Sequence, residues 1–286
     1  IVPGEQAQGM VGATTAAHLL REAREDEQVH AVVLRVDSPG GDAYASEVIR
    51  REVEGLQQAG KPVVVSMGDV AAIGGRWISM DASEIWAQPT TITGSIGIYG
   101  LFVTIPQTLE KLGIHVDGVG TTPIAGAFDI RRPLDPRVES VWASVTEKGY
   151  RNFIGKVAAA RGKTPEQIDA IAQGRVWSGA QAKQRGLVDK LGGLEDAITS
   201  AAARADIAGN YRTRYVEREL SGWERIALSF SNSASARAMT KWSGIDALLP
   251  NLPAVAELRS AVDLLNTLAG NRFGVVAHCF CGLSQH

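Results

Sequence analysis

The chain has 286 residues, a hydrophobic fraction of 45% and a formal net charge of −2. This length suffices for one large folded domain, or for one domain with an appendage. The balanced charge argues against nucleic-acid binding, and no apolar run reaches the roughly 20 residues that a membrane-spanning helix needs. We therefore expect a soluble-type globular chain that binds no nucleic acid.

The first 120 residues alternate between short apolar runs and helical patterns. Strands are predicted at 30–36, 62–66, 84–87, 94–99 and 114–119, with helices at 45–59 and 104–112. Strands that alternate with helices are typical of a mainly parallel sheet with right-handed crossovers. The fold class predicted here is therefore α/β.

The next 90 residues read as mainly helical. Apolar residues recur every three to four positions over 136–160, and further helices are predicted at 164–174, after Ser178 and at 194–205. Thr164-Pro165-Glu166-Gln167 is a capping box with proline at the first helical position. The α/β pattern ends near Gly209. We predict one domain over 1–208 and a helical and irregular appendage over 209–286, which includes a Ser/Ala tract (229–238) and an amphipathic helix (254–268).

The two ends of the chain carry little chemistry. Ile1 is neither an initiator methionine nor the start of a signal peptide, so we expect the chain to be part of a longer precursor. Cys279 and Cys281 are too close for an unstrained disulfide, and with only His278 nearby they make a poor zinc site. No cofactor and no metal site is predicted.

One segment, residues 67–79, has the layout of a nucleophile corner. A β-branched run leads into small residues, two glycines and the start of an amphipathic helix. Such a strand-to-helix corner presents one side chain beside backbone N–H groups. The presented residue is Ile73, whose hydrocarbon side chain cannot attack a carbonyl.

Three further motifs carry a family resemblance. They are Arg-Val-Asp-Ser-Pro-Gly-Gly-Asp at 35–42, Thr-Gly-Ser-Ile-Gly-Ile at 93–98 and Gly-Arg-Val-Trp-Ser-Gly at 174–179. With the corner, they make the chain resemble signal peptide peptidase A (protease IV), a family of Ser/Lys peptidases. The resemblance is closest to the C-terminal half of the long, two-half bacterial form. It implies a crotonase-like (Clp-protease-like) fold.

The resemblance also assigns roles to residues. It implies an oxyanion hole from the amides of Gly41 and the corner, at Ile73 or Gly74, with position 73 as the nucleophile. Site-shaping or substrate-binding roles fall on Ser38, Pro39, Gly40, Gly75, Arg76 and Ser95. The family pattern reads Ala-Ala-Ser-Gly-Gly-Tyr, so this chain departs from it at Ile73 and at Arg76. We expect Arg76 to bring a cation to the rim of the site.

No other residue replaces the missing reagents. Ser79 lies over one and a half helical turns beyond Ile73 and should face elsewhere, and Ser38 is expected to make a turn hydrogen bond. Short family members carry the catalytic Lys in the stretch that corresponds to 120–129, where this chain has none. In the two-half form the Lys belongs to the N-terminal half. The lysines present here are predicted to be solvated charges.

Three functions remain open. The resemblance implies a peptidase half that degrades remnant signal peptides at the bacterial cytoplasmic membrane, through an anchor upstream of this chain, with a Lys-bearing N-terminal half as partner and a homo-oligomeric ring as assembly. As written, with Ile73 and no Lys, it is predicted to be inactive. The alternatives are a non-catalytic scaffold or peptide-binding half of the ring, and an acyl-CoA enzyme of crotonase type. Whether Ile73 is natural, engineered or an error stays open.

Overall fold

The computed structural model describes residues 1–6, 10–216 and 276–277. Its contacts divide the chain into two compact units, one of residues 1–213 with 275–286 and one of residues 214–274. The Ser/Ala tract at 229–238, the helix predicted at 254–268 and both cysteines lie outside the described residues. The predicted appendage and its boundary at residue 209 therefore stay predictions.

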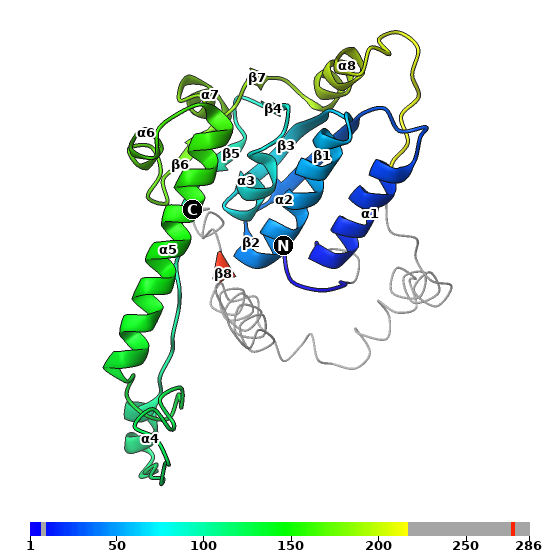
Figure 1. The fold of residues 1–286 in the computed structure, drawn as a ribbon. Helices are drawn as coiled ribbons and strands as arrows, with labels where there is room; N and C mark the ends of the chain where they lie inside the picture. The colour runs from blue at the N-terminus through cyan, green and yellow to red at the C-terminus, as the bar shows by residue number, and fades with distance from the viewer. Residues whose placement is uncertain (7–9, 217–275, 278–286) are drawn as a thin grey trace, which may run out of the picture. The chain divides into compact units, whose positions relative to one another are not determined.

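A six-stranded sheet forms the centre of the larger unit (Figure 1). Its strands are β1 (Val32–Ser38), β3 (Val63–Ala72), β4 (Glu84–Ala87), β5 (Ile92–Gly94), β6 (Val176–Ser178) and β7 (Lys190–Leu191). The long strand β3 pairs in parallel with β1, β4 and β5, and β4 pairs in parallel with β7. Strand β6 runs antiparallel to β5. The α/β class and the mainly parallel sheet are confirmed.

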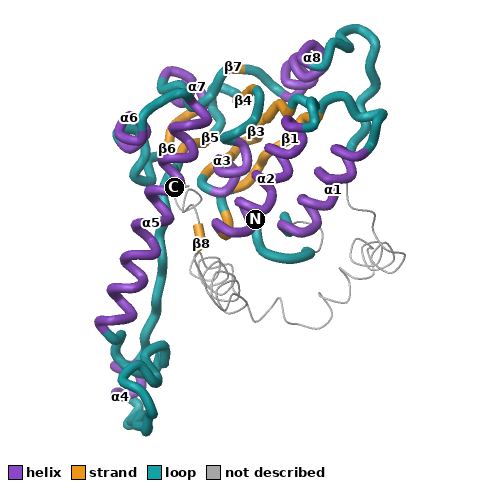
Figure 2. Tube along the Cα trace, in the orientation of Figure 1, coloured by secondary structure: helices purple, strands orange, loops and turns teal. Residues whose placement is uncertain are grey.

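A second, two-stranded sheet joins β2 (Gly41–Asp42) to β8 (Val276–Ala277) in antiparallel register. The helices (Figure 2) are α1 (Ala13–Glu25), α2 (Ala43–Gln58), α3 (Gly74–Ser79), α4 (Pro106–Lys111), α5 (Pro136–Arg161), α6 (Pro165–Asp169), α7 (Gly179–Gln184) and α8 (Leu194–Arg204). Asp42 begins α2 by accepting a hydrogen bond from the N–H of Ala45.

The alternation of side chains along β3 divides the core between two layers. Val63 and Val65 belong to the main apolar cluster with Leu56 of α2, whereas Val64 packs in a separate cluster with Ala197 of α8. Successive strand residues point to opposite faces of a sheet, so α2 and α8 cover different faces of β3. Helix α1 packs beside α2 (Figure 1).

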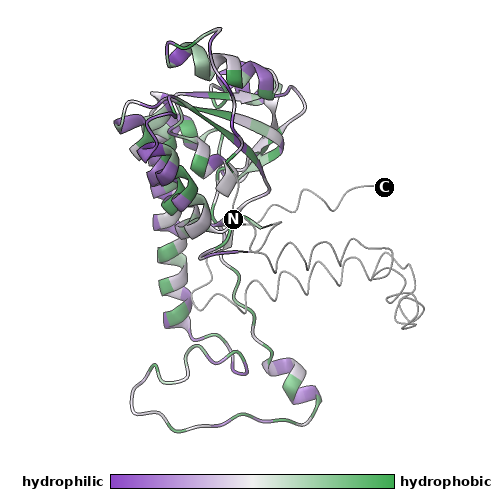
Figure 3. Cartoon of the chain, turned by 90° about the vertical axis from the view of Figure 1, so that its right-hand side faces the viewer, coloured by the Kyte–Doolittle hydropathy of each residue, from purple (hydrophilic) through white to green (hydrophobic). Residues whose placement is uncertain are grey.

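Helix α5 joins this core to a projecting arm, which we define as residues 100–145. The C-terminal half of α5 is anchored in the core, because Phe153 and Val157 are fully buried and the Phe153 ring lies 4.5 Å from that of Trp77. Its N-terminal half extends away from the sheet with α4 (Figure 3). There Val141 and Val145 are 59% and 44% exposed.

Several predicted elements are confirmed. The strand at 84–87 and the helices at 45–59, 104–112, 136–160 and 194–205 lie within two residues of the observed bounds at either end. The capping box of Thr164 is present, and so is one at Ser178. Helix α6 nevertheless ends at Asp169 rather than near Gly174.

The strands predicted at 94–99 and 114–119 are wrong. Strand β5 ends at Gly94, where the first of them should begin, because Ser95 turns the chain with a φ of 47°. Residues 114–119 lie in the arm, mostly exposed, and pair with no strand of the described chain. The short apolar run predicts a strand there, but within the described chain no neighbouring strand lies beside it to pair with it.

Candidate active site

The corner between β3 and α3 holds Ile73 in a backbone conformation that few side chains adopt. Its φ and ψ are 40° and −96°, and its carbonyl accepts the hydrogen bond from Trp77 N–H, at 2.8 Å, that starts α3. A β-branched residue at positive φ is a clear outlier, which persists only where the surroundings impose it. The backbone conformation at Ile73 is therefore imposed by the surrounding residues, because isoleucine itself disfavours it.

Those neighbours include the Ser38-Pro39-Gly40-Gly41 loop. A Cβ placed on Gly74 would lie 3.1 Å from the carbonyl carbon of Gly40 and 3.2 Å from the nitrogen of Gly41. A Cβ on Gly75 would lie 3.1 Å from the carbonyl oxygen of Ser38. The two glycine motifs that the sequence singled out therefore meet backbone to backbone, so closely that a Cβ at either position would force its neighbours to shift.

Ser38 shapes this loop as the sequence predicted. Its hydroxyl donates to the carbonyl of Gly40 at 3.0 Å and accepts from the N–H of Gly40 at 3.3 Å. Both bonds close a tight turn around Pro39. The turn hydrogen bond expected for Ser38 is confirmed.

The backbone of Gly41 is flanked on both edges by other parts of the chain. On one edge, Ile1 N donates to Gly40 O at 2.8 Å and Asp42 N–H donates to Ile1 O at 2.9 Å. A Cβ on Gly41 would come within 2.1 Å of that same Ile1 oxygen. On the other edge lies β8, with Ala277 opposite Gly41. The glycine at 41 is required by the close approach of Ile1.

The other serines near the corner are buried and hydrogen-bonded. Ser79 donates to Gly75 O at 2.6 Å, and the N–H of Ser95 donates to Arg175 O at 2.7 Å. Ser46 was missed by the sequence reasoning. Its hydroxyl donates to Asp42 O at 2.8 Å and lies 2.8 Å from a Cβ built on Gly74. Only the packing of α2 on the corner reveals it, because Ser46 lies outside every motif.

Arg76 corrects one expectation. The side chain is fully buried rather than at the rim, and its Nη1 donates to Leu187 O at 2.6 Å. Its Nε and Nη2 have no hydrogen-bond partner among the residues that the structure describes. Burial, with Arg161 nearby, lowers the pKa of Arg76 to about 9, although Asp189 acts in the opposite direction. Every residue of the short helix α3 is buried, so residue 76 packs inside the fold whichever face of the helix it occupies.

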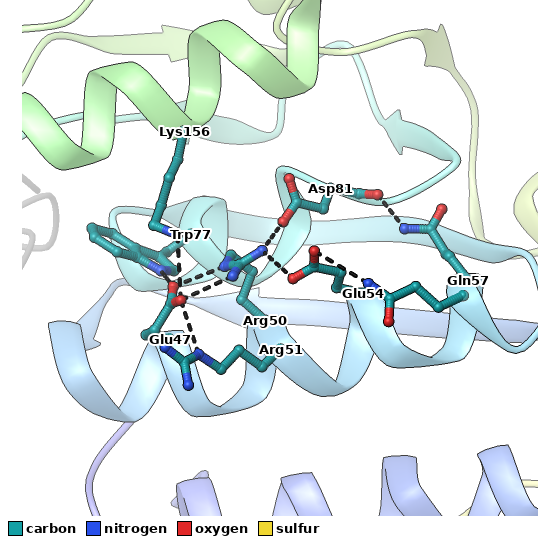
Figure 4. A network of polar contacts seen from close by, with 9 residues as sticks. Glu47, Arg50, Arg51, Glu54, Gln57, Trp77, Asp81 and Lys156 are labelled. Carbon is teal, nitrogen blue, oxygen red and sulfur yellow. Dashed lines mark hydrogen bonds and ion pairs between the residues drawn. The ribbon is translucent and has the colours of Figure 1, made fainter.

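A polar network lies behind the corner (Figure 4). Glu47 of α2 accepts hydrogen bonds from Arg50 and from the indole N–H of Trp77, which lies at 2.9 Å. Arg51 of α2 and Lys156 of α5 also pair with Glu47, each at 3.3 Å. Burial raises the pKa of Glu47, but the hydrogen bonds from Arg50 and Trp77 outweigh it and lower that pKa to about 2.

One of the lysines predicted to be a solvated charge, Lys156, belongs to this network. The side chain of Lys156 is 38% exposed and is ion-paired to Glu47. It therefore ties α5 to α2 as well as facing solvent. Sequence spacing could have found Glu47 with Arg50, three residues apart on one helix face, but not the contacts to α3 and α5.

The described residues contain no helix with both the length and the apolar character needed to cross a bilayer.

Comparison with known proteins gives the class. The family model described as Peptidase family S49 matches residues 55–208. The chain is 47% identical over 250 residues to Protease 4 of Salmonella typhi and 40% identical over 257 residues to Protease 4 of Haemophilus influenzae. The chain belongs to peptidase family S49, and its resemblance to the signal peptide peptidase A family is confirmed.

These relatives are longer proteins. The match to the Salmonella protein covers 87% of this chain and 40% of that protein, and the match to the Haemophilus protein covers 88% and 42%. The chain thus spans about two fifths of the relatives that it matches. Among solved structures, a ClpP1 mutant from Listeria monocytogenes aligns with 65% of this chain and 86% of its own at 15% identity, with a TM-score of 0.44.

Proposed function

We propose that this chain is the C-terminal half of a signal-peptide-peptidase-like serine protease and that, with Ile73 at the nucleophile position, it does not turn over peptides. One observation carries the proposal. The corner keeps a positive-φ conformation against the Gly40–Gly41 loop although its side chain has no attacking atom. Membership of peptidase family S49 supports the assignment of this corner to acyl transfer.

The proposed chemistry assigns one task to each group. A hydroxyl at position 73 would attack the peptide carbonyl, and the amides of Gly41 and Gly74 would donate hydrogen bonds to the oxyanion that forms. A lysine from the N-terminal half would accept the hydroxyl proton and return it to the leaving amine. This chain contributes the geometry but neither the hydroxyl nor the lysine.

The substrate and setting are part of the same proposal. The substrates would be remnants of cleaved signal peptides, reached at the bacterial cytoplasmic membrane through an anchor upstream of this chain. The working assembly would be a homo-oligomeric ring that includes the Lys-bearing half. The greater length of the Protease 4 relatives supports the existence of such a half.

The test restores the missing hydroxyl. Ile73→Ser, co-expressed with a Lys-bearing N-terminal half, is assayed against a fluorogenic peptide rich in leucine and alanine. Of the three proteins, each co-expressed with that half, we expect only Ile73→Ser to turn over the peptide. The unmodified chain and Ile73→Ala should stay at background, because loss of a nucleophile lowers kcat on the order of a million-fold. Equal hydrolysis by all three proteins would refute the proposal.

A second candidate is a non-catalytic half that holds peptide or supports the assembly. The observation that favours it is the arm. Ten large apolar side chains between residues 101 and 145 are exposed: Leu101, Val103, Leu112, Ile114, Val119, Ile124, Phe128, Ile130, Val141 and Val145. Exposed apolar surface of this kind marks contact sites. Intact assembly with a silent Ile73→Ser would support the scaffold over the peptidase.

A further inference from the structure

The strand that carries the Gly41 amide has a partner from the far end of the sequence. Residues 276 and 277 pair with β2 in antiparallel register, Ala277 opposite Gly41 and Val276 opposite Asp42. More than 200 positions separate the two strands in the sequence. The pairing therefore brings a distant segment to the edge of the candidate site.

The edge that this segment occupies can be identified from the contacts of β2. Gly40 O and Asp42 N–H both bond to Ile1, so they face one edge of the strand. The backbone groups of adjacent residues in a strand point to opposite edges. The N–H and C=O of Gly41 accordingly face β8. The amide assigned to the oxyanion lies on the covered edge.

We propose that residues 276–277 act as an internal blocking strand, which occupies the edge of β2 where an extended peptide would dock and which a peptide must displace. This inference rests on the proposed function for the role of Gly41. An extended peptide that adds to a sheet edge uses main-chain hydrogen bonds for affinity. The segment around 276, Gly-Val-Val-Ala, has the small and apolar character expected of the peptides proposed above.

Two proline substitutions in the full chain separate pairing from other effects. Proline lacks an N–H, so Ala277→Pro removes the donor that the alternation aims at Gly41. Val276 lies opposite Asp42, whose N–H is bonded to Ile1, so the N–H of residue 276 points away from β2. Val276→Pro is therefore the matched control, with the same residue type introduced one position earlier.

The measurement is the affinity of a fluorescent peptide that copies residues 272–278. We expect Ala277→Pro to bind this peptide about ten-fold or more tightly than the unmodified chain, because an occupied edge lowers the apparent affinity by the fraction of open molecules. Val276→Pro should match the unmodified chain. Equal affinities for all three proteins would overturn the blocking strand.

A second probe separates the inference from the proposed function. It is a blocked peptide of leucine and alanine, of the signal-peptide type. If Ala277→Pro gains affinity for the copied segment but none for this peptide, the blocking strand holds and the proposed substrate class fails. If Ile73→Ser with the Lys-bearing half cleaves this peptide while Ala277→Pro gains no affinity for either probe, the proposed function holds and the blocking strand fails.

Hydrogen exchange on the unmodified chain covers the case in which Ala277→Pro does not fold. Excess copied peptide should speed exchange at the amide of Ala277 by about ten-fold or more, because the displaced strand loses its partner. Unchanged protection of Ala277, with or without bound peptide, would overturn the inference.

Discussion

Ile73 combines a buried side chain with a backbone angle suited to glycine. It is 5% exposed, and its φ is 40°. A side chain with a Cβ is strained at this angle, and the strain is of the order of 1–3 kcal/mol. The fold around the corner must supply that energy, because isoleucine itself gains nothing from the conformation.

This strain predicts an inverted order of stability at position 73. Ile73→Gly should be more stable than Ile73→Ala by about 1 kcal/mol. Both variants lose the packing of the isoleucine beyond its Cβ, and only glycine accepts positive φ freely. Ile78, buried in α3, is the control. There alanine should exceed glycine by about 1 kcal/mol. Urea unfolding midpoints decide, and the same order at both positions would contradict the strain.

Arg76 and Arg50 are both buried arginines with opposite surroundings. Arg50 bonds to Glu47, Glu54 and Asp81. Within the described part of the chain, Arg76 has one carbonyl partner, and its other two guanidinium nitrogens have none. An unpaired buried charge is costly, and removing one partner of a paired charge is costly too. The two residues should therefore respond to the same substitution in opposite directions.

Arg76→Met should raise the free energy of unfolding by about 1–3 kcal/mol, because a fully buried cation with a single hydrogen bond among the described residues gives way to an apolar chain of similar length. Arg50→Met should lower it by about 2 kcal/mol, after allowance for partly exposed partners. Chemical denaturation at neutral pH measures both. A fall for Arg76→Met as large as that for Arg50→Met would mean that Arg76 has a stabilising partner.

At the residue scale, sequence motifs located the corner but did not predict which side chains around it are buried. The family resemblance, carried by the glycine motifs, implied that Ile73, Gly74 and Gly41 lie together, and the structure brings them together. The burial of Arg76 could not be predicted, because it depends on the loop that contains Leu187, more than 100 residues away. Side-chain burial is a property of tertiary packing, which local pattern does not encode.

At the element scale, Glu47 binds three helices together. It joins α2 to Trp77 of α3 and to Lys156 of α5 (Figure 4). The corner begins α3, so this carboxylate connects the corner to the helix that carries the arm. Loss of its charge should loosen all three contacts at once.

The pH dependence of this link has a definite sign. The pKa of Glu47 is lowered from 4.5 to about 2 in the folded chain. Its contribution to stability is therefore complete above pH 4.5 and is lost as the pH falls toward 2. Glu47→Gln should be less stable than the unmodified chain at neutral pH, and the difference should shrink in that acid window.

Urea midpoints at a series of pH values measure this difference. Glu147→Gln is the control, because Glu147 pairs with Arg151 on the exposed surface, where a pair contributes at most about 1 kcal/mol. A constant gap between Glu47→Gln and the unmodified chain across the acid window would refute the assignment.

Prediction of elements succeeded where a pattern was long or capped. Helix α5 has Asp135 as its cap, Pro136 in its first turn and Gly162 at its end, all readable in the sequence. Helix α1 was not predicted, because alanines make up most of its buried face and contrast weakly with their surroundings. Strands β6 and β7 are too short for any pattern to show.

At the scale of the molecule, the arm is the part whose role the core does not explain. Large apolar side chains stay exposed along it, among them Val141 and Val145 on the free half of α5. We expect them to contact another subunit in the assembly proposed above. The fold class was predictable from alternation, but the projection of the arm was not, because periodicity does not say what a helix packs against.

The paired substitution Val141→Ser and Val145→Ser should shift the chain to smaller species in light scattering after gel filtration. Loss of apolar contact area weakens association, while exposed substitutions change folding stability by only about 0.5 kcal/mol. Lys148→Ser, also exposed on α5, should leave the size distribution as it was. An unchanged mass for the double variant would exclude this face of the arm from assembly.

Trp77 lies where the anchored half of α5, the helix that carries the arm, packs on the rest of the larger unit. Its indole stacks near Phe153 of α5 and donates to Glu47 of α2, four residues beyond the corner. Indole emission shifts in wavelength when such a pocket opens to water. Trp77 is therefore an intrinsic fluorescence probe. In a variant that lacks the other tryptophans, its emission would show in real time whether α5 and the corner move together.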